Sequence, residues 1–421
     1  MKMNCLHPRP LSTLTAILLG FQPLFAGTYT VVDTGQVKCY DNSREIDPPS
    51  PGRVFHGQDA QYNGAQPAYR DNGDGTVSDL NTGLMWIEKP GDKKTFDEAV
   101  AGAGKCRVGG YSDWRLPTIK ELYSLILFSG TNPSGQHDST NGLRPFIDTN
   151  YFDFEYGNPR NGERVIDSQF ATCTRYVSTT MNGAATMFGV NFADGRIKGY
   201  PSGRDPRGRT KTYYVLYVRG NPAYGENQFH ANGDGTVTDR ATGLTWMMVD
   251  SGHLKAGNTS DGSLNWKEAL EWAERLTFAG HDDWRLPNAK ELQSIVDYSR
   301  SPDTTRSPAI DPVFKCTSIV NEAGERDWAF YWTSTTHAGK YRASEAVYVA
   351  FGRALGKMRF PHMRSAEVMD VHGAGAQRSD TKSGDRSRFP ISRGPQGDIV
   401  RVYNLVRCVR GGLPGDGSTL P

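Results

Sequence analysis

The sequence predicts an α+β protein built from two tandem homologous domains, each with a mostly antiparallel sheet, two helices and long loops. Two repeated stretches support a duplication: DWRLP occurs at 113–117 and at 283–287, and NGDGTV occurs at 72–77 and at 232–237. Weaker echoes follow both copies in the same order, which is typical of a repeated domain. Strand-like segments precede and follow a pair of helices without regular alternation, and this order favours α+β over α/β.

The chain divides into five segments on this basis. An apolar run at 11–21, preceded by Lys2 and Arg9, predicts a secretory signal peptide, and the run is too short to span a bilayer. The segments are a signal peptide at 1–26, an N-terminal extension at 27–64, domain 1 at 65–220, domain 2 at 226–412 and a flexible tail at 413–421. We therefore expect a protein that is secreted, periplasmic or displayed on the cell surface.

Each domain begins with a predicted β-meander. Glycine-containing turns bracket the short alternating segments TVSD at 76–79 and TVTD at 236–239. The strand that follows each segment carries one tryptophan, Trp86 or Trp246. Both indoles are predicted to lie in the core.

Two helices per domain are predicted from capping boxes, in which a polar N-cap residue is followed by Glu three positions later. Such a box satisfies two otherwise unpaired backbone N–H groups, and loss of the cap costs about 1 kcal/mol. The four boxes are Thr95 with Glu98, Thr118 with Glu121, Asn265 with Glu268, and Asn288 with Glu291.

The DWRLP copies each precede the second helix of a domain. Proline biases the residue before it toward extended geometry, so RLP carries an extended segment up to the helix. We expect Trp114 and Trp284 to be buried anchors, and Arg115 and Arg285 to be held by nearby carboxylates or carbonyls. The nearest carboxylates in the sequence are Asp113 and Asp283. A structural role for the motif is favoured over a ligand site.

Catalytic and metal-binding patterns are weak. The echoes pair YVSTT at 176–180 with WTSTT at 332–336, but His337 has no histidine counterpart after Thr180. A hydroxyl without an oriented base is a poor nucleophile, so we expect a non-enzymatic protein. The Asx-Gly turns fail as EF-hands, and a looser calcium site at Asp74, Asp79, Asp234 and Asp239 stays open beside a purely structural role for the turns.

Charge is balanced overall and unevenly distributed. The chain has 48 Lys and Arg against 46 Asp and Glu, so its global charge indicates no partner. Residues 196–219 nevertheless carry a net charge of +6, and residues 353–410 carry +7. Both stretches precede the final strand of their domain and read either as solvated loops or as surfaces for polyanions. The candidate ligand-binding residues are Arg196, Lys198, Arg204, Arg207, Arg209, Lys211, Arg353, Lys357, Arg359 and Arg364.

Cysteine number fits an extracytoplasmic protein without a zinc site. Five cysteines follow the signal peptide, at 39, 106, 173, 316 and 408. Outside the cytoplasm we expect most of them to be oxidised, with one left over. None lies in a CxxC or Cys/His cluster, so no structural zinc is expected.

The repeated pattern NGDGTVxDxxTGLxW … DWRLPxxKEL … VRG resembles the Lcl C-terminal domain family, named for a collagen-like adhesin of Legionella. Both domains match, and the resemblance implies binding of sulfated glycosaminoglycans. More remotely, RLPNAKEL and the closing VRCVRG of domain 2 are similar to the C-type-lectin-like core of formylglycine-generating enzyme relatives. In such domains a helix cysteine and a final-strand cysteine can be bridged. Here Cys106 and Cys408 occupy those places in different domains, so they either join across the domains or pair elsewhere.

The sequence thus predicts a ligand-binding, adhesin-like protein that takes acidic or sulfated polysaccharide through Arg-rich loops. No nucleic-acid partner is expected outside the cell. Two rival functions stay open: a structural or assembly module of the envelope, and an oxidase of the formylglycine-generating type.

Overall fold

Short strands and tight glycine turns open each domain, as the sequence predicts. Gly75 and Gly235 have φ of 82° and 94°, which a residue with a side chain rarely adopts. The turns allow antiparallel meanders that the last strand of each domain then joins. The strands are β3 (Tyr69–Asp71), β4 (Thr76–Asp79), β5 (Leu84–Ile87) and β9 (Val218–Gly220) in domain 1, and β10 (Phe229–Ala231), β11 (Thr236–Asp239), β12 (Thr245–Met247) and β22 (Val409–Arg410) in domain 2.

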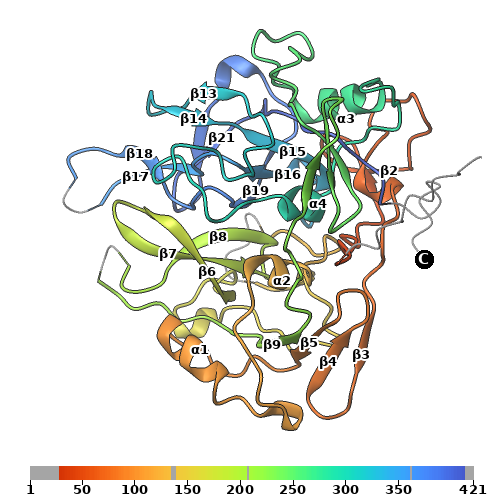
Figure 1. The fold of residues 1–421 in the computed structure, drawn as a ribbon. Coiled ribbons are helices and arrows are strands. Elements are labelled where there is room, and N and C mark those ends of the chain that lie inside the picture. Colours follow the sequence, from red (N-terminus) through yellow and green to blue (C-terminus); the bar gives the residue numbers. More distant parts are fainter. Residues whose placement is uncertain (1–27, 134–138, 206–207, 361–362, 413–421) are drawn as a thin grey trace, which may run out of the picture.

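A computed structural model describes residues 28–133, 139–205, 208–360 and 363–412 (Figure 1). Domain 1 forms the lower half in that view and domain 2 the upper half. The predicted signal peptide and tail lie outside the described residues, as does Arg207. Within the described ranges, no helix is long and apolar enough to cross a membrane.

All four predicted helices are present with their capping boxes. The helices are α1 (Phe96–Ala103), α2 (Ile119–Tyr123), α3 (Trp266–Glu274) and α4 (Ala289–Ser294). In each, the N-cap side chain accepts a hydrogen bond from the backbone N–H of the predicted glutamate, and that glutamate accepts one from the N-cap N–H. Helix starts are therefore fixed by local chemistry that the sequence displays directly.

The two domains share one six-stranded antiparallel sheet between them. Its order is β15 (Phe330–Thr336), β16 (Glu345–Ala350), β19 (Gln377–Thr381), β8 (Arg196–Pro201), β7 (Ala184–Asn191) and β6 (Gln169–Thr180). Strand β19 of domain 2 pairs with β8 of domain 1 at Gln377 and Ile197. Val190, Ile197 and Val347 are fully buried on this sheet. Burial of the shared sheet favours a fixed arrangement of the two domains.

Smaller antiparallel sheets complete the molecule. The second four-stranded sheet of domain 2 has the order β18-β17-β21-β20, and two short hairpins pair β1 with β2 and β13 with β14. Their bounds are β1 (Cys39–Tyr40), β2 (Glu45–Ile46), β13 (Ser318–Val320), β14 (Arg326–Trp328), β17 (Leu355–Met358), β18 (Glu367–Asp370), β20 (Ile391–Arg393) and β21 (Asp398–Val400). The fold is therefore α+β, with mostly antiparallel sheets and few helices.

The predicted tryptophan anchors are buried. Trp86 and Trp246 have no exposed surface, and Trp114 and Trp284 are 4% and 2% exposed. The indole N–H of Trp114 donates to the carbonyl of Val108 at 3.1 Å, and that of Trp284 donates equivalently to a carbonyl at 3.0 Å. Burial gives all four indoles a structural role, and the N–H is satisfied in Trp114 and Trp284 but has no hydrogen-bond partner among the described residues in Trp86 and Trp246.

The motif arginines are held by nearby carboxylates, as predicted, but the choice of Asp113 and Asp283 as those carboxylates is wrong. Arg115 forms a two-pronged ion pair with Glu121, and Arg285 does the same with Glu291. Each glutamate is already held over the helix start by its capping box, so its second oxygen is positioned for the guanidinium fork. The aspartates of the motif instead bind the final strand, Asp113 to Arg219 and Asp283 to Arg410, each at 2.7 Å.

The expected alignment of the STT motifs between the two domains is shifted by five residues. The N–H of Ser334 donates to the carbonyl of Pro287, and in domain 1 the matching bond to Pro117 comes from Cys173. Thr335 and Thr174 likewise accept from the first helical N–H of α4 and α2. The counterpart of 332–336 is therefore 171–175, because β6 continues past the point where β15 ends.

The expected disulfides are not formed. All five cysteines of the described chain are free. Cys106 packs at the edge of one hydrophobic cluster, while Cys408 lies inside another. Burial raises the pKa of the Cys39 thiol to about 11 and that of Cys408 further, which keeps both sulfurs protonated and unreactive.

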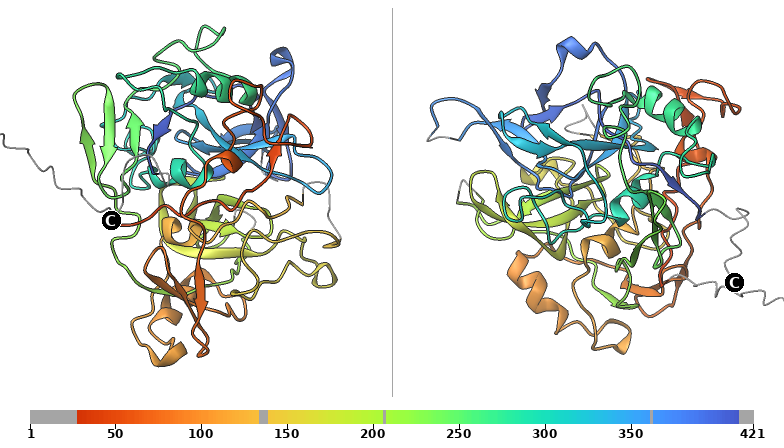
Figure 2. Two further views of the ribbon diagram at one scale, coloured as in Figure 1. Left: turned by 90° about the vertical axis from the view of Figure 1, so that its right-hand side faces the viewer. Right: turned by 45° about the horizontal axis from the view of Figure 1, so that its top comes forward.

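The N-terminal extension follows the upper half of the molecule (Figure 2, left). The Gln36 side chain donates to the carbonyl of Thr336 at 2.7 Å and accepts from the same residue's N–H at 2.9 Å. The Asp59 carboxylate accepts from the Thr335 hydroxyl at 2.5 Å. The extension is therefore attached mainly to the β15 edge of domain 2, with a smaller contact from Thr34 to Phe128 of domain 1.

Candidate functional site

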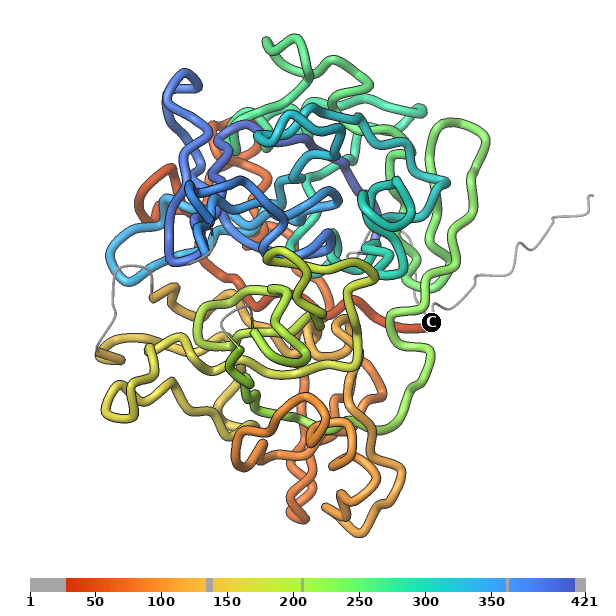
Figure 3. Tube along the Cα trace, turned by 90° about the vertical axis from the view of Figure 1, so that its left-hand side faces the viewer, coloured from red at the N-terminus to blue at the C-terminus, as the bar shows by residue number. Residues whose placement is uncertain are grey.

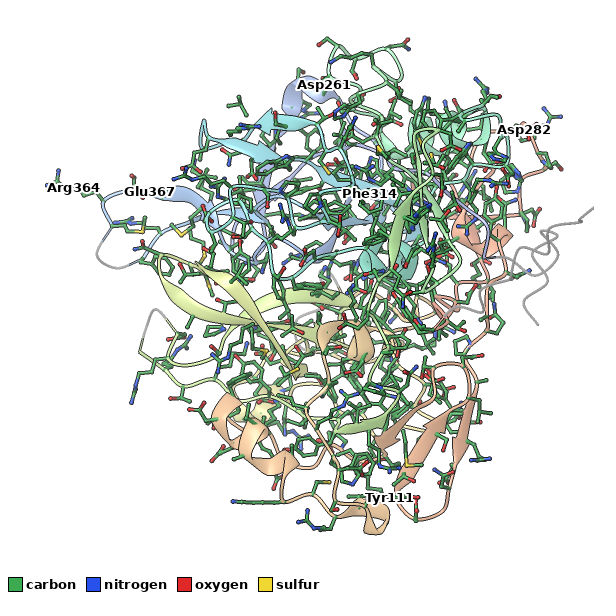
Figure 4. All side chains as sticks on the ribbon, in the orientation of Figure 1. Tyr111, Asp261, Asp282, Phe314, Arg364 and Glu367 are labelled. Carbon is green, nitrogen blue, oxygen red and sulfur yellow. The ribbon has the colours of Figure 1, made fainter. Side chains whose placement is uncertain are left out.

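Two loops carry the exposed part of the predicted cationic surface. The first cationic loop follows β8 of domain 1 and is described at 202–205 and 208–211. The second comprises the end of β17 from Lys357 and the described parts of its connection to β18, at 359–360 and 363–366. Both project on the left-hand side in Figure 1, and Figure 4 labels Arg364 at the outermost point of that side. Loops from different domains thus reach the same side of the molecule.

The strands that carry the two loops are joined by hydrogen bonds between the domains. The N–H of Gly199, in β8, donates to the carbonyl of His372 at 2.9 Å, and the N–H of Met181 donates to the carbonyl of Asp370 at 2.8 Å. The Tyr176 hydroxyl donates to the Asp370 carboxylate at 2.9 Å. These bonds attach β8 and the β6–β7 hairpin of domain 1 to the β17–β18 hairpin of domain 2, at the end opposite its loop.

The first cationic loop presents Arg204 and Arg209 to solvent. The Arg204 guanidinium donates to the carbonyl of Gly208 at 2.7 Å, and Arg209 forms an ion pair with Asp205 at 2.8 Å. Lys211 is half-buried over the Tyr200 ring, and its pKa is lowered by burial. Among the described cations of this loop, Arg204 is thus the one most available to an anionic ligand.

The second cationic loop exposes Lys357, Arg359 and Arg364. None of these three forms an ion pair with another residue in the described ranges. The Arg359 Nε donates to the carbonyl of Met363 at 3.4 Å, which links the two described sides of the loop. One exposed acid, Glu367, begins β18 beside these cations. Unpaired exposed cations of this kind can bind an oxyanion without first breaking an internal ion pair.

A methionine cluster supports the second loop. Met181, Phe360 and Val371 are buried together, and Met358, Met363 and Met369 pack against them in part. The flexible thioethers fill an irregular space between the β6–β7 hairpin and the β17–β18 loop. No periodic pattern in the sequence marks this cluster, because its members come from separate turns and strand positions in two domains.

Arg196 and Lys198 are in the wrong place for a loop surface. Both lie in β8 and are 7% and 8% exposed. Asp194 accepts from Lys198 at 2.6 Å, and Arg196 contacts both Asp194 and Glu345 at 3.4 Å. Burial lowers the pKa of Lys198 to about 8. The two cations belong to an ionic network at the junction of the domains, where a polysaccharide does not reach them.

The Arg353 side chain is also held by ion pairs within the protein. It is 13% exposed and forms ion pairs with Asp303 at 2.6 Å, Asp327 at 3.4 Å and Glu325 at 3.5 Å. The charge count of the stretch from 353 to 410 therefore overstates its free positive charge. Sequence reasoning could not separate buried from exposed cations, since both occur in the same Gly-rich stretches.

One further exposed cation lies beside the first loop. Arg175, in β6, has its guanidinium 3.5 Å from the Ser202 hydroxyl and stacked on the Phe96 ring at 4.5 Å. The position follows from the bulged path of β6, which the sequence does not reveal. It extends the first cationic surface toward α1.

The aspartates of the Asx-Gly turns serve the turns themselves. Asp74 and Asp234 each accept from the N–H and hydroxyl of the threonine two residues on, at 2.6–3.0 Å. Asp79 and Asp239 accept from backbone N–H groups of the next turn. Among the described residues, no group of three or more His, Cys, Asp or Glu could hold a metal ion.

Comparison with known families identifies both repeats. The family model for the Lcl C-terminal domain matches residues 75–219 and 235–369. Searches of curated proteins and of solved structures gave no match. The two matched stretches together cover more than half of the 421 residues. The chain therefore belongs to the Lcl C-terminal domain family, of which it carries two tandem copies.

Proposed function

We propose that the protein is a secreted, periplasmic or surface-displayed binding protein for acidic or sulfated polysaccharide. The observation that carries this proposal is the convergence of exposed, unpaired cations from two domains on one side of the molecule. Lys357, Arg359 and Arg364 come from domain 2, and Arg204 comes from domain 1. A linear polyanion can contact both loops at once, which raises the effective concentration of the second contact.

The shape of the site favours a polymer over a small ligand. The exposed cations lie on projecting loops, so they offer charge without enclosure, whereas small-molecule sites are concave. Guanidinium groups bind sulfate and carboxylate oxygens in paired hydrogen bonds. The binding role is non-enzymatic in this proposal, because it rests only on the exposed cations in the described parts of the two loops.

Retention on immobilised heparin tests the proposal. The variant pair Arg204→Ser with Arg209→Ser removes charge from the first loop, and Lys357→Ser, Arg359→Ser with Arg364→Ser removes it from the second. Both variants are expected to elute at lower salt than the native protein, because each lost contact weakens a screened electrostatic attraction. The unfolding midpoint is expected to be unchanged, because these side chains are exposed.

The matched control is Arg53→Ser with Arg275→Ser, two exposed arginines outside both loops. This control removes the same charge as the first-loop variant. If it shifts elution as much as the loop variants do, binding depends on net charge alone and the proposed site is wrong.

We also keep the proposal that each domain is a variant of the C-type-lectin-like fold. The features in its favour are two helices per domain and a final strand that returns to pair with the opening meander, as β9 does with β5 and β22 with β12. A structural or assembly role in the envelope is the rival, and a stable oligomer in light scattering without polysaccharide would favour it.

A further inference from the structure

A cavity away from the cationic loops is built from three separate parts of the chain. It has a volume of about 390 Å³, within the range of small-ligand sites. Its walls come from 36–45 of the extension, 128–131 and 142–144 of domain 1, and 338–343 of domain 2. In Figure 3 the domain 2 segment reaches the left edge, whereas the cationic loops face the viewer. The cavity therefore exists only where both domains and the extension meet.

The cavity walls are held by hydrogen bonds between the three parts. The Gln36 amide donates to the carbonyls of Phe128 and Thr336 at 3.3 and 2.7 Å. The N–H of Ala343 donates to the carbonyl of Ser43 at 2.8 Å, and that of Asn132 to the carbonyl of Ala338 at 2.8 Å. Each pair of neighbouring walls is thus linked directly, so the cavity is formed before a ligand arrives.

The lining is strongly cationic. Its charged residues are Lys38, Arg44, Arg144, Lys340 and Arg342, with Glu45 as the only acid of the lining. Glu45 is neutralised by Lys38 at 2.7 Å, and Arg44 contacts Asp41 at 3.4 Å. Within the described ranges Arg144 and Arg342 have no carboxylate partner. Arg144 lies close enough to Tyr40 to lower that hydroxyl's pKa, against the larger upward effect of burial.

The same lining carries features that inorganic anions do not require. Tyr341 is 79% exposed, an unusual position for a large aromatic ring, and the Lys340 ammonium lies 5.1 Å from its centre. Ser43, Ser129 and Thr131 add hydroxyl groups to the wall. An exposed ring suits the C–H face of a pyranose, hydroxyls suit its hydroxyls, and guanidinium forks suit its acid group.

We propose that this cavity binds a single carboxylated or sulfated pyranose. Arg144 and Arg342 hold the acid group, and Tyr341 packs on the ring. The site is distinct from the cationic loops and stands whether or not they bind polysaccharide. The sugar is either free or the end of a longer chain, since both present the same chemistry to the cavity.

Titration calorimetry with defined sugars tests the site on the full-length protein. The probes are glucuronate and glucosamine 6-sulfate, with glucose and inorganic sulfate for comparison, and a heparin-derived hexasaccharide to represent a chain end. At least one charged sugar or the hexasaccharide is expected to bind more tightly than sulfate and glucose. Arg144→Ser with Arg342→Ser is expected to weaken that binding by roughly tenfold or more, because two charge-assisted contacts are lost.

Two further variants distinguish the cavity from a simple anion site and from the cationic loops. Tyr341→Ala is expected to weaken sugar binding while leaving the weak binding of sulfate unchanged. The first-loop variant, Arg204→Ser with Arg209→Ser, is expected to leave monosaccharide binding unchanged even if it reduces retention on heparin. A native-like thermal midpoint for each variant shows that the fold is intact.

The proposal is overturned by any of three results. The first is that neither charged monosaccharide nor the hexasaccharide binds the native protein. The second is that sulfate binds as tightly as the charged sugars, which would make the cavity an ion site only. The third is that the Arg144 and Arg342 changes leave sugar affinity unaltered while the fold is intact.

Discussion

The two domains share an internal frame of capped helices, buried tryptophans and Arg–Glu pairs, but different segments cover these pairs from solvent. The side chain of Arg115 in domain 1 is 36% exposed, whereas that of Arg285 in domain 2 is 4% exposed. The Tyr62 ring of the extension lies 5.5 Å from the Arg285 guanidinium, and the carbonyl of Gly411 accepts a bond from it. The Arg–Glu pair forms in both settings, so the repeated motif is a structural device that does not depend on its surroundings.

A second difference lies just before the strand that closes each domain. Arg407 in domain 2 is fully buried, and its guanidinium donates to carbonyls of Met247, Met248 and Val249 at 2.7–3.0 Å. The next residue of domain 2, Cys408, aligns with Tyr217 of domain 1, and both lie directly before the shared VRG segment. The frame thus accepts unlike residues at equivalent core positions when the local loops supply partners.

The largest expected difference between the domains follows from the covered Arg–Glu pair. Glu291→Ala leaves Arg285 buried without a charge partner, and we expect a loss of about 3–5 kcal/mol in unfolding free energy. Glu121→Ala is expected to cost less, because the partly exposed Arg115 can be hydrated. Urea unfolding of both variants measures the difference, and equal losses would contradict the role given to the cover.

A pH effect in the part of the N-terminal extension that covers domain 2 is next in size. Burial, followed by the nearby Asp33, raises the pKa of Asp59 to about 7. The pKa of Asp59 is higher in the folded than in the unfolded protein, so its contribution to stability is complete below about pH 4. That contribution is lost as pH rises through about 7, and the loss in unfolding free energy is at most about 4 kcal/mol. Asp59→Asn is expected to flatten the stability profile across that window. An unchanged profile would show that Asp59 does not titrate there.

A tight contact found only in domain 1 gives the third test. A Cβ atom added at Gly102 of α1 would lie 2.1 Å from the Tyr217 hydroxyl, which itself donates to the carbonyl of Ala99 at 2.8 Å. Gly102→Ala is therefore expected to cost about 1–3 kcal/mol through overpacking. Tyr217→Phe removes the clashing oxygen, so the double variant should lose less than the sum of the two single losses. Additive losses in thermal unfolding would rule out the contact.

The smallest effect concerns a feature that the domains share. Thr118→Ala and Asn288→Ala each remove an N-cap side chain from the second helix of a domain. We expect a loss of about 1 kcal/mol from each. Similar losses, measured by urea unfolding, would support a common frame, and a loss confined to one domain would break the equivalence.

Local chemistry explains which parts of the fold the sequence could predict. Capping boxes, glycine turns and buried tryptophans depend on neighbours a few residues away, so the helices, meanders and cores were predictable. The partners of Arg115 and Arg285 were misassigned because sequence proximity favours Asp113 and Asp283, while the capping geometry directs Glu121 and Glu291 to the guanidinium groups.

Contacts between distant segments explain what the sequence could not predict. The sheet shared through β8 and β19 buries Arg196 and Lys198, although their surrounding composition is that of a loop. Cys106 and Cys408 belong to separate clusters, although the resemblance to C-type-lectin-like domains allows a bridge between them. The cavity between the extension and both domains has no motif at all, since its lining comes from three unrelated segments.

The central claim is that a common frame supports polyanion binding at two cationic loops. Hydrogen–deuterium exchange with and without a heparin-derived oligosaccharide tests this most directly. The account predicts slower exchange in 202–205 and 363–367 on binding, with no change in α2 and α4. Slower exchange in the two helices with none in the loops would contradict the account.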